Sequence, residues 1–265
     1  MTKVMAVEPL TPLAPYTGGK RFLARHIIRR IDAVPHDCYA EAFVGMGGVF
    51  LRRHQAPKSE IINDYSRDVA TFFRVLQRHY VAFVDMMCFH LTTRVEFERL
   101  VATDPETLTD LERAARFFYL QNTAFGGKVT ARNFGVAPGR PARFDITRLG
   151  TILEEVHSRL ARVVIECLPY EEFITRYDRP GTLFYLDPPY WGSEGDYGKN
   201  MFGRQDFTKL AILLNQIKGQ FLLSINDRPE VRELFARFNI ESVKTTYTMN
   251  DGPGKRVEEL IIGSV

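Results

Sequence analysis

The sequence predicts an α/β fold in which a mostly parallel β-sheet is covered by helices on both faces. Three observations predict this fold. Short β-branched or aromatic runs recur along the chain, helical patterns separate most of them, and a turn-forming Asn-Asp-Gly-Pro-Gly run at 250–254 lies between the last two strand-like runs. Strands that alternate with helices usually pair in parallel, because each helix returns the chain to the same edge of the sheet.

The strand-like runs are short and rich in Val, Ile, Leu and aromatic residues, as buried strands are. They lie at residues 38–43, 60–63, 163–167, 182–187, 221–225, 242–248 and 259–262. Helical spacing of apolar residues is found at 20–31, 68–79, 207–217 and 229–238. The turn signal between the last two runs predicts a closing hairpin, with the final strand antiparallel to its neighbour.

The strand pattern is missing between about residues 66 and 162. Residues 69–120 have helical patterns, whereas 122–145 are rich in Gly, Arg and Asn and are predicted to be loops. We therefore predict a core domain built from 1–65 and 163–265, interrupted by an insertion at 66–162.

Composition indicates a globular protein. Of 265 residues, 45% are hydrophobic and 25% are charged, which is ordinary for a chain that buries a substantial core. The three cysteines are an odd number without close spacing, so neither a disulfide framework nor a thiolate zinc site is expected. Reduced thiols, and the lack of a signal-like or membrane-spanning apolar run, lead us to expect a cytoplasmic protein without a membrane partner.

Positive charge is concentrated in two places, although the net charge is only +3. One cluster holds Lys20, Arg21, Arg25, Arg29 and Arg30. The other, between residues 126 and 148, holds Lys128, Arg132, Arg140, Arg143 and Arg148 against Asp145 alone. Such clusters can be solvated faces or can contact the phosphates of a polyanion.

A glycine-rich turn follows the first long strand-like run, in the sequence Glu41-Ala-Phe-Val-Gly-Met-Gly-Gly48. Glycines there allow positive φ and let backbone N–H groups approach a ligand, although a tight turn without a ligand has the same pattern. The run is not G-x-G-x-x-G, because Phe50 stands at the third glycine position, which disfavours a nicotinamide or flavin enzyme.

An acidic residue, Asp64, ends the second strand-like run, 19 residues beyond Gly45. A carboxylate at that distance can accept hydrogen bonds from both hydroxyls of a ribose, and it can also cap the next helix. Together with the glycine turn, it favours a cofactor that contains a nucleoside.

The most specific motif is Asp187-Pro-Pro-Tyr190, at the carboxyl end of a buried strand. Ligands of open α/β sheets bind at that edge. The prolines stiffen the backbone and add no N–H donors, so the Asp187 carboxylate and the Pro188 carbonyl form an acceptor pair that suits an amino group. Tyr190 offers a flat face for stacking a base. The same four residues could instead form a rigid turn with Tyr190 in the core.

These motifs, in this order, resemble those of the Dam-type (D12 class) DNA adenine-N6 methyltransferases. The resemblance starts at Tyr16-Thr-Gly-Gly-Lys20, includes the runs described above, and ends at Glu258-Glu-Leu-Ile-Ile262. Residues 187–198 are most similar to phage- and prophage-borne members. The resemblance implies a Rossmann-like methyltransferase sheet with an antiparallel terminal strand, S-adenosylmethionine as the cofactor and methylation of adenine N6 by base flipping.

The resemblance also implies a role for each matched residue. Asp187, Pro188, Pro189 and Tyr190 are the implied catalytic residues. The implied cofactor-binding residues are Tyr16, Gly18, Gly19, Lys20, Glu41, Phe43, Gly45, Gly47, Gly48, Asp64 and Asp187. The insertion is expected to recognise double-stranded DNA through Asn122, Phe125, Lys128, Arg132, Asn133 and Arg140. No metal is implied, and a monomer or weak dimer is expected.

The sequence departs from the family pattern at Ser66, where Asn is frequent, and at Phe207, where His is frequent. The insertion matches loosely, so no target sequence follows. A cytosine-N4 or RNA amino-methyltransferase has the same amino-group chemistry and stays open as an interpretation. A catalytically silent DNA-binding relative and a nucleotide-dependent oxidoreductase stay open as well, although the glycine pattern disfavours the oxidoreductase.

Overall fold

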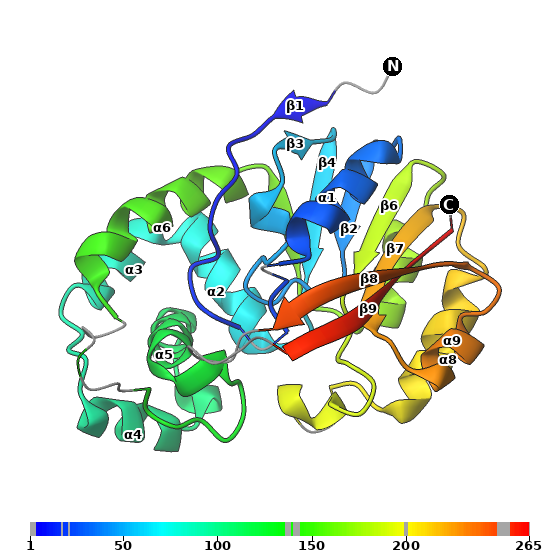
Figure 1. Cartoon of the computed structure of the whole chain (residues 1–265). Helices are drawn as coiled ribbons and strands as arrows, with labels where there is room; N and C mark the ends of the chain where they lie inside the picture. The colour runs from blue at the N-terminus through cyan, green and yellow to red at the C-terminus, as the bar shows by residue number, and fades with distance from the viewer. Residues whose placement is uncertain are drawn as a thin grey trace.

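A seven-stranded sheet forms the centre of the computed structural model, which describes residues 4–16, 18–20, 22–135, 139, 144–198, 201–247 and 255–264 (Figure 1). In spatial order its strands are β5 (Val163–Glu166), β4 (Ser59–Asn63), β2 (Cys38–Glu41), β6 (Thr182–Leu186), β7 (Gln220–Asn226), β9 (Lys255–Gly263) and β8 (Asn239–Tyr247). The first five pair in parallel, whereas β9 is antiparallel to both β7 and β8. The predicted parallel sheet and closing hairpin are therefore confirmed; residues 248–254 of the turn lie outside the described residues.

The sheet is buried on both faces because its strands alternate between two hydrophobic clusters. In β6, Leu183 and Tyr185 belong to one cluster, while Phe184 and Leu186 belong to the other. This alternation follows from the two-residue period of a strand. The first cluster packs under the helices before β5, and the second packs under α7 (Tyr170–Tyr177), α8 (Arg204–Leu214) and α9 (Pro229–Leu234).

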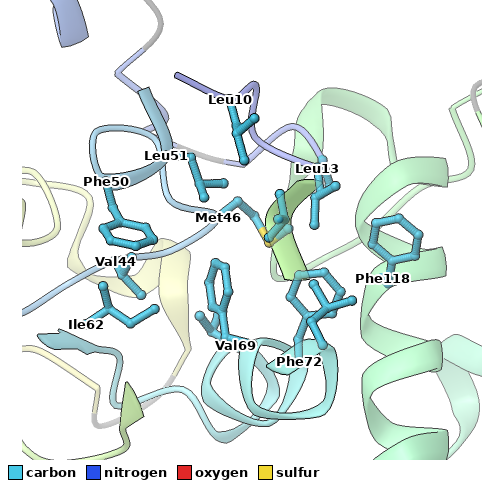
Figure 2. Packing of buried hydrophobic residues seen from close by; sticks show 14 of the residues in the cluster. Leu10, Leu13, Val44, Met46, Phe50, Leu51, Ile62, Val69, Phe72 and Phe118 are labelled. Carbon is cyan, nitrogen blue, oxygen red and sulfur yellow. The ribbon is translucent and has the colours of Figure 1, made fainter. Parts of the chain in front are cut away.

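The first cluster joins distant parts of the chain. Figure 2 shows Leu13 of the N-terminal segment, Met46 of the glycine turn, and Phe72 and Phe118 of two helices around a common core. The rings of Phe72 and Phe118 stack, with centroids 5.4 Å apart. The glycine turn is thus supported from below by packed side chains.

The segment between β4 and β5 is helical. Its helices are α2 (Arg67–Arg78), α3 (Tyr80–Met87), α4 (Arg94–Ala102), α5 (Asp110–Thr123) and α6 (Ile146–Leu160). A capping box of Thr109 and Glu112 starts α5, since each residue hydrogen-bonds the other's backbone N–H. This segment contributes to the same core as the sheet, through Phe72, Phe118 and Leu153.

Several elements were not predicted. They are α6, α7, and a two-stranded sheet of β1 (Met5–Ala6) and β3 (Gln55–Ala56). Helix α7 has only eight residues, too few for a clear helical period, and β1 and β3 have two residues each. Helix α1 (Ala24–Ala33) overlaps the predicted helix at 20–31 but starts later. In the part of the chain that the structure describes, no helix is long and apolar enough to cross a membrane.

Candidate active site

The carboxyl ends of the parallel strands bring the motif residues to one edge of the sheet. Glu41, the last residue of β2, is in register with Tyr185 of β6, and Asp187 lies just beyond the end of β6. Pro188 and Pro189 are buried, while Asp187 and Tyr190 are partly exposed. This is the edge at which open α/β sheets bind their ligands.

Two groups hold one oxygen of Asp187. Lys20 Nζ lies 2.7 Å from Oδ1, and the Ser224 hydroxyl donates to the same oxygen at 3.1 Å. Ser224 is itself hydrogen-bonded to the buried Tyr185 hydroxyl. Among the described residues, no group donates to Oδ2. The Asp187 side chain is 18% exposed, so Oδ2 is the oxygen that remains for a ligand.

Burial raises the pKa of Asp187 to about 6, against the opposing effect of the Lys20 ammonium. The Glu259 carboxylate adds to the rise, and the hydrogen bond from Ser224 opposes it. The carboxyl group therefore titrates just below neutral pH, and Lys20 keeps it largely ionised at pH 7.

Tyr190 is fixed by its hydroxyl, which donates to Glu259 Oε1 at 2.6 Å and accepts from Lys20 Nζ at 3.0 Å. The next residue is fixed as well, because Trp191 N donates to Asn226 Oδ1 and Asn226 Nδ2 donates to the Trp191 carbonyl. Phe207 is completely buried against the Trp191 ring. Phe207, which stands where the family often has His, thus packs against Trp191 in the core.

The glycine turn is joined to Asp64. Gly45 N donates to Asp64 Oδ2, and Ser66 N donates to Oδ1, each at 2.9 Å. Burial raises the pKa of Asp64 to about 6, against these two backbone hydrogen bonds. Gly45 has φ +51°, and a Cβ there would lie 2.9 Å from the Tyr16 ring, so glycine allows the ring to pack against the turn. A Cβ at Gly48 would lie 3.4 Å from the backbone nitrogen of Lys20, so the turn lies next to the residue that pairs with Asp187.

Glu41 is buried below this turn and accepts a hydrogen bond from the Tyr39 hydroxyl at 2.6 Å. Burial raises its pKa to about 8, so its carboxyl group is mostly protonated at neutral pH. Phe43 is partly exposed and packs against Tyr170 and Phe202. The structure therefore brings the predicted cofactor-binding residues and the predicted catalytic residues together at one site.

Comparison with known proteins decides the family. The sequence model of the D12 class N6 adenine-specific DNA methyltransferases matches residues 16–249. The chain belongs to this family. It is accordingly an adenine-specific DNA methyltransferase with a Rossmann-like sheet, and the expected methylation of adenine N6 in DNA is confirmed.

Its curated relatives are methyltransferases of similar length. It is 25% identical to the type II methyltransferase M.CviBI of Paramecium bursaria Chlorella virus NC1A, over 85% of this chain and 86% of the relative. It is 26% identical to the type II methyltransferase M1.LlaDCHI of Lactococcus lactis subsp. cremoris, over 96% and 95%. It is also 26% identical to the DNA adenine methylase of Salmonella typhi, over 93% and 92%.

Only some of the residues predicted to contact DNA lie at the surface of the methyltransferase. Phe125, Lys128 and Asn133 are exposed and Arg132 is partly exposed, whereas Arg140 lies outside the described residues. The prediction that Asn122 lies in a loop is wrong: it lies in the last turn of α5, is 7% exposed, and donates to the Phe118 carbonyl. Helix α5 continues through Asn122 and Thr123, where the polar composition had suggested that a loop begins.

Lys20 is also not part of a solvated basic face, because its side chain is 2% exposed and paired with Asp187. Three further site residues were missed from the sequence. Ser224 and Glu259 contact the catalytic motif, and Gln121 Nε2 donates to the carbonyls of Pro15 and Gly127, 2.7 and 2.6 Å away. Glu259 lies within the Glu258–Ile262 run of the family resemblance. The sequence nevertheless gives none of the three residues a role of its own, since each acts through a contact with a distant segment.

Proposed function

We propose that this methyltransferase transfers a methyl group from S-adenosylmethionine to N6 of an adenine turned out of double-stranded DNA, with Asp187 and the Pro188 carbonyl accepting the amino hydrogens. The proposal depends on one observation, which is that the two carboxylate oxygens of Asp187 differ in their hydrogen-bond and ion-pair partners. Oδ1 is held by Lys20 and Ser224, whereas no described residue donates to Oδ2.

The residues of the glycine turn fit such a cofactor. Each Asp64 oxygen accepts one backbone N–H and keeps a lone pair for a ribose hydroxyl. Tyr16, Gly18, Gly19, Lys20, Gly45, Gly47 and Gly48 are the residues that would line the cofactor beside it. When bound, the cofactor would supply an electrophilic methyl group on a sulfonium sulfur.

The chain's own residues then act on the amino group. The N6 lone pair of adenine is delocalised into the ring, so it is a poor nucleophile. If Asp187 Oδ2 and the Pro188 carbonyl accept the two N6 hydrogens, the nitrogen can pyramidalise and direct its lone pair out of the ring plane. The positive charge that develops on N6 lies beside the Asp187 carboxylate, which stabilises it. The same carboxylate is placed to accept the proton that N6 then loses.

Turning the base out of the duplex costs a few kcal/mol. Stacking on the Tyr190 ring would return about 1–3 kcal/mol, as base–aromatic contacts do. We assign DNA recognition to residues 66–162, in which Phe125, Lys128, Arg132 and Asn133 are at least partly exposed. The basic side chains of this segment would contact phosphates, which makes binding dependent on salt.

The test is to incubate the protein with methyl-labelled cofactor and DNA and to analyse the nucleosides. Labelled N6-methyladenine supports the proposal. Labelled N4-methylcytosine would show that Asp187 and the Pro188 carbonyl bind the amino group of cytosine instead. DNA that stays unlabelled although the protein binds it would indicate a catalytically silent DNA-binding relative.

A further inference from the structure

A buried carboxylate to which the sequence assigned no role completes the site. Glu259 lies on β9, in register with Asn226 of β7, and is 1% exposed. Because β9 is antiparallel to β7, its early residues reach the edge at which β6 and β7 end. The chain buries this acid although burial of an ionised carboxylate is costly unless it is paired.

The partners of Glu259 are the groups that define the site. Its Oε1 accepts the Tyr190 hydroxyl at 2.6 Å, and its Oε2 lies 3.9 Å from Lys20 Nζ. Lys20 in turn lies 3.0 Å from the Tyr190 hydroxyl and 2.7 Å from Asp187 Oδ1. One ammonium thus stands between two carboxylates and a phenol.

We propose that Glu259 is a positioning residue for methyl transfer, which fixes the Tyr190 ring and the Lys20 ammonium relative to Asp187. The inference rests on the proposed function, which assigns the adenine to Asp187 and Tyr190. Without Glu259, the Tyr190 hydroxyl loses the carboxylate to which it donates at 2.6 Å, and Lys20 loses one of the two carboxylates on either side of it. The Tyr190 ring, on which the base would stack, and the Lys20 ammonium beside Asp187 are then no longer held in place.

The role also has an electrostatic part. Among the described residues, the ionisable groups that interact electrostatically with Asp187 are Lys20 from the N-terminal segment, Glu259 from β9, Glu41 from β2, and Tyr185 of β6. The Tyr185 hydroxyl is also hydrogen-bonded to Ser224. The negative charge of Glu259 raises the pKa of Asp187. Removing this charge therefore lowers the pKa of Asp187, an effect that a purely structural role does not produce.

Two substitutions separate geometry from charge. Glu259→Gln keeps an acceptor for Tyr190 and removes the charge, whereas Glu259→Ala removes both. We expect Glu259→Ala to lower the single-turnover methylation rate about 100-fold, the loss that a misplacement of about 1 Å can cause, with little change in the KM of the cofactor. Glu259→Gln should keep most of the rate at neutral pH and move the acidic limb of the pH–rate profile to lower pH.

Glu258→Gln is the matched control, since Glu258 is on the same strand, is 51% exposed and pairs only with Lys244 among the described ion pairs. It should leave the rate and the profile unchanged. In a Tyr190→Phe background, Glu259→Ala should cost less than in the wild type, because the shared hydroxyl is already absent. Equal costs in the two backgrounds, or a wild-type rate in Glu259→Ala, would overturn the proposal.

A second measurement does not depend on turnover. In protein with ¹³C-labelled Asp carboxyls, the Asp187 resonance, assigned with Asp187→Asn, should titrate with a midpoint near the pKa of about 6 and at lower pH in Glu259→Gln. An unchanged midpoint refutes the electrostatic role. A wild-type protein that makes no N6-methyladenine refutes the proposed function instead, and the titration still decides whether Glu259 controls Asp187.

Discussion

Lys20 Nζ lies 2.7 Å from Asp187 Oδ1, and this ion pair joins the N-terminal segment to the end of β6. Both side chains are largely removed from water. The pair determines which oxygen of Asp187 is occupied, and it holds the pKa of the carboxyl lower than burial alone would allow. The first three predictions below follow from this contact.

Asp187→Asn should abolish most methyl transfer while cofactor binding survives. The amide has nearly the same shape but cannot stabilise the charge that develops on N6, and removal of one such electrostatic contact costs about 10²–10³ in kcat. Single-turnover methylation and equilibrium cofactor binding measure the two effects. Glu230→Gln, on an exposed side chain of α9, is the control. Turnover near the wild-type level in Asp187→Asn would remove the proposed catalytic centre.

The wild-type rate should rise as the pH increases through about 6, because the proposed chemistry needs Asp187 ionised and burial raises its pKa to about that value. The rate is low below this pKa and reaches a plateau above it. Single-turnover rates between about pH 5 and pH 8 at constant ionic strength measure the profile. A rate that is flat across this window contradicts a catalytic carboxylate at residue 187.

Lys20→Met should move this acidic limb to higher pH. The substitution keeps an unbranched side chain and removes the charge that lowers the pKa of Asp187. It also leaves Asp187 and Glu259 without their shared cation, and breaking a buried ion pair costs about 3–5 kcal/mol. Denaturant unfolding measures this loss, and the pH–rate profile measures the shift. An unchanged profile with lowered stability would restrict Lys20 to a structural role.

Asp64→Asn should weaken cofactor binding about tenfold, which corresponds to about 1.4 kcal/mol. A neutral amide is a poorer acceptor for both the Gly45 backbone N–H and a ribose diol. Isothermal titration with the cofactor measures the change, and DNA affinity, measured separately, should not change. Equal loss of both affinities would indicate that the substitution disturbs the fold.

Lys128→Ala and Arg132→Ala should each weaken DNA binding and reduce the slope of log K against log salt by about 0.9, the value for one phosphate contact. Binding titrations at several salt concentrations measure the slope. Arg179→Ala is the control, because Arg179 is exposed at the loop before β6, far along the chain from the helical segment. If neither variant changes the slope, residues 128 and 132 do not contact the phosphates.

The central sheet could be predicted from the sequence, whereas the 15-residue helix α6 was missed although it is long and contributes to the core. The strand-like runs at β2, β4, β6 and β7 are largely apolar, and the Asn-Asp-Gly-Pro-Gly turn indicated the β8–β9 hairpin. Helix α7 and the small sheet of β1 and β3 were missed because they are too short to show a period.

The candidate site was predictable where residues are adjacent in sequence, and not where they meet only in the folded chain. Asp187 and Tyr190 share one motif, and the strand end places both at the sheet edge. Glu259 and Gln121 contact this site or its surroundings from other segments, and a single sequence carries no record of such pairings. Asn122 was misjudged because a polar side chain at the end of a helix can be satisfied internally.

The antiparallel direction of β9 also matters while the protein is being made. The ribosome releases the catalytic motif well before Glu259, and until β9 arrives, β7 presents an unpaired edge to other chains. A nascent polypeptide that has reached residue 247 therefore carries the glycine turn and the Asp187 motif but lacks the Glu259 carboxylate to which the Tyr190 hydroxyl donates. The contact that fixes the Tyr190 ring therefore forms only when the hairpin closes, after the rest of the site has been synthesised.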